Sequence, residues 1–109
     1  MIRRANNFLL VIYEAHLLGD IRKCLKLLDN SGKYFYIKHF KDDVPPHYHI
    51  YFSSNGFVDE IQIEALFIEH VASRVFVEPA KISKYSYITY MLRNDKYEIR
   101  DIKGTLSLA

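Results

Sequence analysis

The sequence has no tryptophan, one cysteine and only four glycines among its 109 residues, and its charges nearly balance. The single cysteine, Cys24, cannot form a disulfide within the chain, so the cysteine content gives no indication of an oxidising compartment. The glycines are scattered and form no G-x-x-x-x-G-K pattern, which argues against a phosphate-cradling loop of that type. The formal net charge of +2 is too small to indicate nucleic-acid binding by itself.

Long hydrophobic runs are absent as well. The apolar run from Phe8 to Tyr13 is too short for a signal peptide or a membrane span, and no small-residue cleavage site follows it. We therefore expect a buried strand there, in a soluble protein located in the cytoplasm. Half of the residues are hydrophobic, which suits one domain, residues 1–109, with a core large enough to fold without metal or disulfides.

The spacing of the apolar residues predicts both strands and helices. Alternating or continuous apolar runs bounded by turn residues predict strands at 8–14, 34–40, 46–53, 74–78 and 96–102. Helical spacing predicts helices at 17–28, 58–72 and 81–93, although the alternation at 61–63 leaves a strand open at the start of the second. These elements indicate an α+β fold, in which a central antiparallel β-sheet of about five strands is flanked by α-helices.

Three of the five histidines lie close together in the sequence, at positions 39, 47 and 49. In a strand, His47 and His49 point to one face with their Cα atoms roughly 7 Å apart, so both rings can bind one metal ion. A short link to the preceding strand favours a hairpin that brings His39 to the same place, with Asp42 as a candidate oxygen ligand. Strand histidines more often make only a hydrogen bond, but the third imidazole and the carboxylate favour a metal site here.

The third predicted helix carries a second signal. Its apolar stripe contains Tyr85, Ile88 and Leu92, whereas Tyr87 and Tyr90 fall on roughly the opposite face. A tyrosine off the core stripe is available for chemistry. The alternative is a surface aromatic with no chemical role.

In combination, these motifs resemble the HUH endonucleases. The segment His47-Tyr48-His49 is similar to the His-hydrophobe-His motif of that superfamily. Further segments resemble the catalytic domain of the single-tyrosine rolling-circle replication initiators of small plasmids and viruses: His39-x-x-Asp42, Pro46 to Ile50, Tyr85 to Tyr90 and Asn94 to Tyr97. The resemblance extends from Phe8 to about Ile102.

The resemblance implies both a site and an activity. His47, His49 and His39 would bind a divalent metal, Mn²⁺ or Mg²⁺, with Asp42 as a fourth ligand, although imidazoles alone would equally allow zinc. Tyr87 would attack a phosphate of single-stranded DNA and form a 5′-phosphotyrosine, which allows both nicking and joining. These initiators often have histidine where this chain has Tyr90, so Tyr90 stays open as the alternative nucleophile.

The expected partner is single-stranded origin DNA, including a hairpin, with no membrane partner. Five basic residues would contact its backbone phosphates: Lys38, Lys41, Lys81, Lys84 and Arg93. Because 109 residues leave no room for an oligomerisation or helicase domain, a homodimer and a separate helicase are the further expected partners. Three other functions stay open: a single-tyrosine transposase, a DNA-binding module without a catalytic metal, and a hydrolytic metalloenzyme acting on a small substrate.

Overall fold

The computed structural model describes residues 3–40, 44–73, 75–93 and 102–106, and it has the predicted α+β fold. One antiparallel sheet contains five strands in the order β4-β1-β3-β2-β5. The strands are β1 (Arg4–Tyr13), β2 (Gly32–His39), β3 (His47–Asp59), β4 (Phe76–Pro79) and β5 (Lys103–Gly104). The helices are the 3-10 helix η1 (Glu14–His16) and the α-helices α1 (Ile21–Ser31), α2 (Glu60–Ala65) and α3 (Lys84–Arg93).

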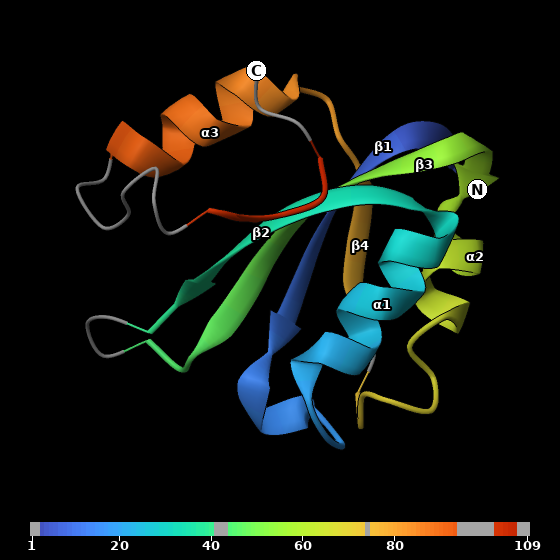
Figure 1. The fold of residues 1–109 in the computed structure, drawn as a ribbon, viewed down its shortest axis with the longest axis vertical. Helices are drawn as coiled ribbons and strands as arrows, with labels where there is room; N and C mark the ends of the chain where they lie inside the picture. The colour runs from blue at the N-terminus through green and yellow to red at the C-terminus, as the bar shows by residue number, and fades with distance from the viewer. Residues whose placement is uncertain (1–2, 41–43, 74, 94–101, 107–109) are drawn as a thin grey trace.

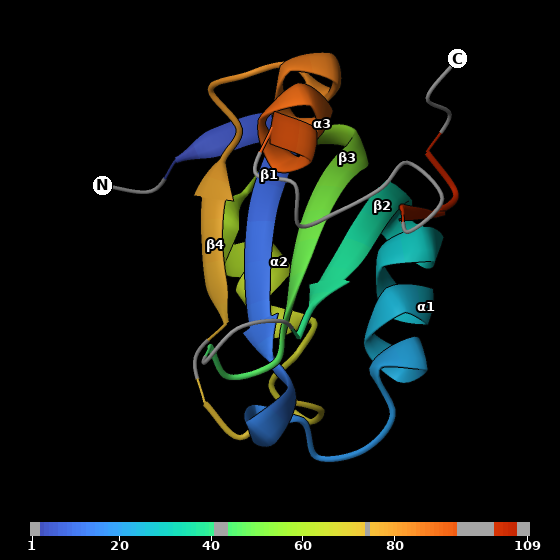
Figure 2. The ribbon, with the colours of Figure 1, turned by 90° about the vertical axis from the view of Figure 1, so that its left-hand side faces the viewer.

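The sheet carries a separate apolar cluster on each face. Helices α1 and α2 lie on one side of the sheet and α3 lies on the other (Figures 1 and 2). Phe8, Leu10 and Ile12 of β1 belong to the first cluster, which α1 and α2 cover. The second cluster lies under α3 and consists of Phe35, Ile37, Tyr51 and Tyr87. In Figure 2, α3 lies over the end of its face that is farther from the hairpin between β2 and β3.

Helix α1 begins later and ends later than its apolar spacing predicts. Asp20 caps its first turn, because the Asp20 carboxylate accepts a hydrogen bond of 2.9 Å from the backbone N–H of Arg22. The turn residues at 29–32 predict that the helix stops there, and this prediction is wrong, since residues 29–31 continue the helix and β2 follows at once from Gly32. A side chain at Gly32 would clash with the backbone of Ser53, so only glycine allows this close approach to β3.

The sequence Ser53-Ser54-Asn55-Gly56 also predicts a turn, and this prediction is wrong. Strand β3 continues through it to Asp59, and the Ser54 hydroxyl donates a 3.0 Å hydrogen bond to the carbonyl of Asn6 in β1. Helix α2 then begins with a capping box, in which Asp59 and Gln62 each accept a hydrogen bond of 2.9 Å from the other's backbone N–H. Residues 61–63 are therefore helical, and the helix is shorter than the predicted range of 58–72.

The remaining predictions for the fold divide into two groups. The strands expected at 8–14, 34–40, 46–53 and 74–78 are confirmed with shifted ends. The expected strand at 96–102 lies almost entirely outside the described residues, which resume at Ile102, just before β5. None of the helices in the described ranges is long and apolar enough to cross a membrane.

We expect Gly32→Ala to lower the free energy of unfolding by at least about 2 kcal/mol, because the new methyl group displaces the backbone of β3. Chemical denaturation in the presence of EDTA measures this effect. Gly19→Ala is the matched control, since nothing lies within 4 Å of the added Cβ. Equal stability of the two variants would contradict the close approach of β2 to β3.

Candidate metal centre

The three clustered histidines lie on one face of the sheet at the hairpin between β2 and β3. His39 is the last residue of β2 and pairs directly with His47, the first residue of β3. His49 lies two residues farther along β3 and pairs with Ile37. Paired residues in an antiparallel ladder point to the same face, so all three imidazoles share the face that α3 partly covers. The prediction that a hairpin brings His39 to His47 and His49 is confirmed.

The three imidazoles are close enough to bind one metal ion. The ring centroids of His39 and His47 are 4.9 Å apart, and those of His47 and His49 are 4.7 Å apart. One ring nitrogen from each histidine lies within 4.8 Å of the other two. Asp42, the candidate fourth ligand, and Lys41 lie outside the described residues.

A backbone carbonyl determines which nitrogen of His47 is available as a ligand. Nδ1 of His47 lies 2.7 Å from the carbonyl oxygen of Pro45, which can only accept, so Nδ1 carries the hydrogen and donates it. In the neutral ring Nε2 therefore keeps a lone pair that points toward His49. A carbonyl that orients a ligand imidazole in this way is the usual partner of metal-binding histidines.

The spacing between His47 and His49 also suits a shared ion. Their two Nε2 atoms are 3.0 Å apart. Two nitrogens that bind one ion at right angles, each at about 2.1 Å, lie about 3.0 Å from each other. The same separation suits a hydrogen bond in which Nε2 of His49 donates to Nε2 of His47. The three ring nitrogens and their spacing thus fit a divalent metal. Without a metal, His47 and His49 form a hydrogen bond with each other.

Burial keeps His49 in the neutral form that binds metals. The pKa of His49 is lowered from 6.5 to about 4, first by its burial and then by repulsion from His47 and His39. His39 and His47 are themselves only 8% and 6% exposed. A metal ion therefore has no proton to displace from a charged His49 at neutral pH.

Tyr87 lies on the same side of the sheet as the histidines, and the predicted orientation of its helix was wrong. Tyr87 is buried with 8% of its surface exposed, whereas Tyr85, which we expected in the apolar stripe, is 54% exposed. The ring centroid of Tyr87 is 5.9 Å from that of Tyr51 and 6.3 Å from that of Phe35. These contacts turn Tyr87 toward the sheet. Tyr90 is 64% exposed on α3.

The basic residues that were predicted to contact phosphates, and that the structure describes, lie on different elements. Lys38 points to the opposite face from His39, because neighbouring residues of a strand alternate, and its ammonium group lies 3.0 Å from a carboxylate oxygen of Glu14. Lys81 is exposed just before α3. Lys84 begins α3, with its ammonium group 5.2 Å from the ring centroid of Tyr85, and Arg93 is the last residue of that helix.

Two contributors to the site were missed from the sequence. One is the Pro45 carbonyl, and the other is Tyr13, which pairs with His47 and places its ring 5.1 Å from that of His47. Neither has a sequence signal, because both contacts depend on backbone geometry and on the register between β1 and β3.

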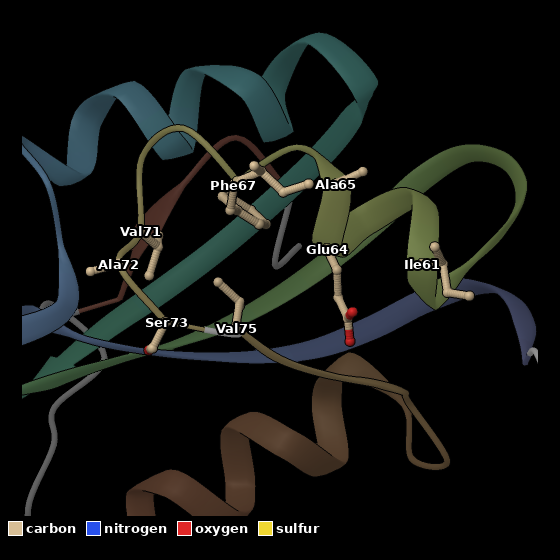
Figure 3. Close-up of a pocket in the computed structure, with 9 residues that line it drawn as sticks. Ile61, Glu64, Ala65, Phe67, Val71, Ala72, Ser73 and Val75 are labelled. Carbon is tan, nitrogen blue, oxygen red and sulfur yellow. The ribbon is translucent and has the colours of Figure 1, made fainter.

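A cavity of about 390 Å³ lies away from the histidines. Residues of α2 and of the segment between α2 and β4 line it. Apolar side chains dominate its lining, among them Phe67, Val71 and Val75, and the side chain of Glu64 extends away from Phe67 (Figure 3). Glu64 is the one titratable residue among the described residues that line it. This cavity therefore lacks the group of metal ligands or catalytic side chains that the histidine cluster offers.

A comparison with models of known protein families found no match, and a search among curated proteins found no similar sequence. The chemistry of the site is therefore argued from its own residues.

We expect the wild-type chain to bind one divalent ion, which isothermal titration calorimetry detects with Mn²⁺ and with Zn²⁺. At a free metal concentration of 100 times Kd, binding stabilises the fold by about 2.7 kcal/mol. His49→Gln removes one of the three ligands and should abolish the binding. The control His70→Gln changes a histidine outside the cluster and should bind as wild type; unchanged stoichiometry in His49→Gln would contradict the site.

The depressed pKa of His49 predicts a dependence of stability on pH in EDTA. Between pH 6.5 and about 4, the unfolded chain takes up a proton at this position and the native chain does not. Stability is therefore lost as the pH falls through this window, by on the order of 2 kcal/mol once partial solvent screening is included.

Denaturation at a series of pH values measures this loss. The loss should be smaller by that amount in His49→Gln, while His70→Gln should follow the wild type. Parallel curves for wild type and His49→Gln would show that His49 titrates normally in the fold.

Proposed function

We propose that this protein is a metal-dependent endonuclease that nicks and rejoins single-stranded DNA through a covalent tyrosine intermediate, and that it initiates rolling-circle-type replication of a plasmid or virus. The observation that carries the proposal is that Tyr87 faces the same side of the sheet as His39, His47 and His49. A nucleophile and three metal ligands on one surface are the parts that a phosphoryl transfer to tyrosine requires.

Strand β3 connects the two parts of this site. Tyr51, which contacts Tyr87, lies two residues from His49, so their Cα atoms are roughly 7 Å apart and their side chains share a face. Tyr51 thus links Tyr87 to the histidines, and we propose that a phosphodiester held at the imidazoles reaches the hydroxyl group of Tyr87. Tyr90, in contrast, is 64% exposed on α3. Tyr87 is accordingly our nucleophile, with Tyr90 as the alternative.

His39, His47 and His49 would hold the divalent ion, for which we propose Mn²⁺ or Mg²⁺. A bound ion of this kind polarises a phosphate oxygen and neutralises charge that develops on it during attack. Imidazole nitrogens suit zinc as well, so the choice of metal rests on the resemblance to the replication initiators.

In the proposed reaction, the hydroxyl oxygen of Tyr87 attacks phosphorus and the bond from phosphorus to the 3′ oxygen breaks. The phenolic proton is lost, and the leaving oxygen gains a proton to become a free 3′-hydroxyl. The new ester between tyrosine and the 5′-phosphate is itself a phosphodiester, so it replaces the broken linkage with one of the same kind. The 3′-hydroxyl of a strand can therefore reverse the step, so nicking and joining are one activity.

The proposal also specifies the environment of the reaction. The substrate is single-stranded origin DNA, with Lys81 and Lys84 near α3 as candidate phosphate contacts. We propose that the protein acts in the cytoplasm of a host cell together with a helicase that is a separate protein. A homodimer is the proposed assembly.

Mass spectrometry of the intact protein tests the nuclease directly. We expect a DNA adduct when wild type is mixed with a pool of single-stranded oligonucleotides, including hairpins, in the presence of Mn²⁺. EDTA and the substitution Tyr87→Phe should each abolish the adduct, because the first removes the ion and the second removes the nucleophilic oxygen. Tyr90→Phe is the matched control and should form the adduct at a rate close to that of wild type.

Other outcomes identify the alternatives. An adduct lost only in Tyr90→Phe would keep the reaction and change the nucleophile. Binding of the oligonucleotides without any adduct, unchanged by EDTA, would indicate a DNA-binding module. Hydrolysis of a small phosphodiester that persists in Tyr87→Phe would indicate a hydrolytic metalloenzyme.

A further inference from the structure

A small pocket lies next to the histidine cluster, at the point where β4 ends its pairing with β1. The last pair of that ladder is Val11 with Phe76, so Tyr13 at the end of β1 has no partner in β4. A cavity of about 160 Å³ is present there. Tyr13, His16, Ser73 and Phe76 are among the residues that line it.

The lining combines flat aromatic surfaces with polar atoms. Tyr13 is 40% exposed and Phe76 is 54% exposed, so both rings offer surface to a ligand. The ring of His16 lies 5.9 Å from that of Tyr13, and its Nδ1 atom is 2.7 Å from the hydroxyl oxygen of Ser73. Rings of this kind stack on planar aromatic ligands, while the imidazole and the hydroxyl suit the polar edge of such a ligand.

The position of the pocket relates it to the histidines. Phe76 pairs with Val11, and Val11 pairs with His49, so Phe76 and His49 share one face two strands apart. Two interstrand steps place their Cα atoms about 10 Å from each other. Tyr13 lies between the pocket and the cluster, because it lines the pocket and its ring is 5.1 Å from that of His47. A strand whose phosphate lies at the histidines would thus bring a neighbouring base to the pocket.

The volume limits the ligand to a single planar group. A protein cavity of about 150 Å³ is large enough to hold benzene. The pocket, at about 160 Å³, therefore accepts one base ring but not two stacked bases. Aromatic platforms that hold single bases in this way are common in proteins that bind single-stranded nucleic acid.

We propose that the pocket formed by Tyr13, His16, Ser73 and Phe76 binds one nucleobase of the DNA strand, next to the phosphate that is cut. This inference rests on the proposed nuclease function and adds a specificity site to it. The pocket fixes the position of the strand along the sheet, so that one phosphate and not its neighbours reaches the histidines.

Phe76 is the residue to change, because it is exposed and lies outside the histidine cluster. The probe is a pool of labelled single-stranded oligonucleotides, and fluorescence anisotropy with Tyr87→Phe as the parent chain measures affinity without chemistry. Adding Phe76→Ala should raise Kd by about 5- to 100-fold, the usual effect of removing one stacked aromatic. Phe76→Tyr keeps the ring and should restore affinity to within about twofold of the parent.

The matched control is Phe57→Ala. Phe57 is a 63% exposed phenylalanine near the other end of β3, so its loss should leave Kd unchanged. Metal affinity measured by calorimetry should be the same in the parent and in Phe76→Ala. Equal Kd values for Phe76→Ala and Phe57→Ala would overturn the pocket, whether or not wild type forms the covalent adduct.

The results for the pocket and for the nuclease are separable. Loss of affinity in Phe76→Ala without any wild-type adduct would support base binding and reject the nuclease. An adduct in wild type with no effect of Phe76→Ala on affinity would keep the nuclease and reject the pocket. Free deoxynucleoside monophosphates that bind as tightly as the oligonucleotides would overturn the assignment to a strand.

Discussion

The pairing of His39 with His47 across β2 and β3 is the constraint on which the rest of the site depends. A slip of one residue in this register would turn the histidines of one strand to the opposite face. The apolar residues between and beyond the β3 histidines oppose such a slip, because Ile50 and Phe52 are fully buried in the core on the other face. Burial of each large apolar side chain contributes about 1.5–3 kcal/mol, so the core that folds the sheet also holds the imidazoles together.

Without a metal, the clustered imidazoles lower the stability of the fold as the pH falls. Burial and mutual repulsion depress the pKa of His49 to about 4, which means that the folded chain resists a proton that the unfolded chain accepts readily. Apolar side chains of similar volume at these positions would fold without this penalty. The arrangement is useful when a cation takes the place of protons, and the hydrogen bond from His47 to the Pro45 carbonyl prepares one lone pair for it.

Strand alternation was enough to predict the histidine cluster from the sequence, because a period of two and one short hairpin place all three side chains. Helix α3 was harder, since tyrosines lie on both of its faces and helical spacing alone cannot decide which of them is buried. Phe35 and Tyr51, which are far from α3 in the sequence, contact Tyr87 and so bury it. Tyr85 is left exposed to solvent. The contact of Tyr13 with His47 was also beyond prediction, because it depends on the register of β1 against β3.

Strand β3 joins the two parts of the proposed site, the histidines that would bind the metal and the tyrosine that would attack the phosphate. Its residues His47, His49 and Tyr51 follow each other at intervals of two, so one rigid strand carries two ligands and the ring on which Tyr87 packs. The position of the proposed nucleophile relative to the candidate ligands therefore depends on the packing of Tyr87 against Tyr51. The reversible transfer proposed above would benefit from this, because the same positions would have to serve attack by tyrosine and attack by a 3′-hydroxyl. A strand that carries two of the histidines and the ring on which Tyr87 packs would supply that fixed geometry in either direction.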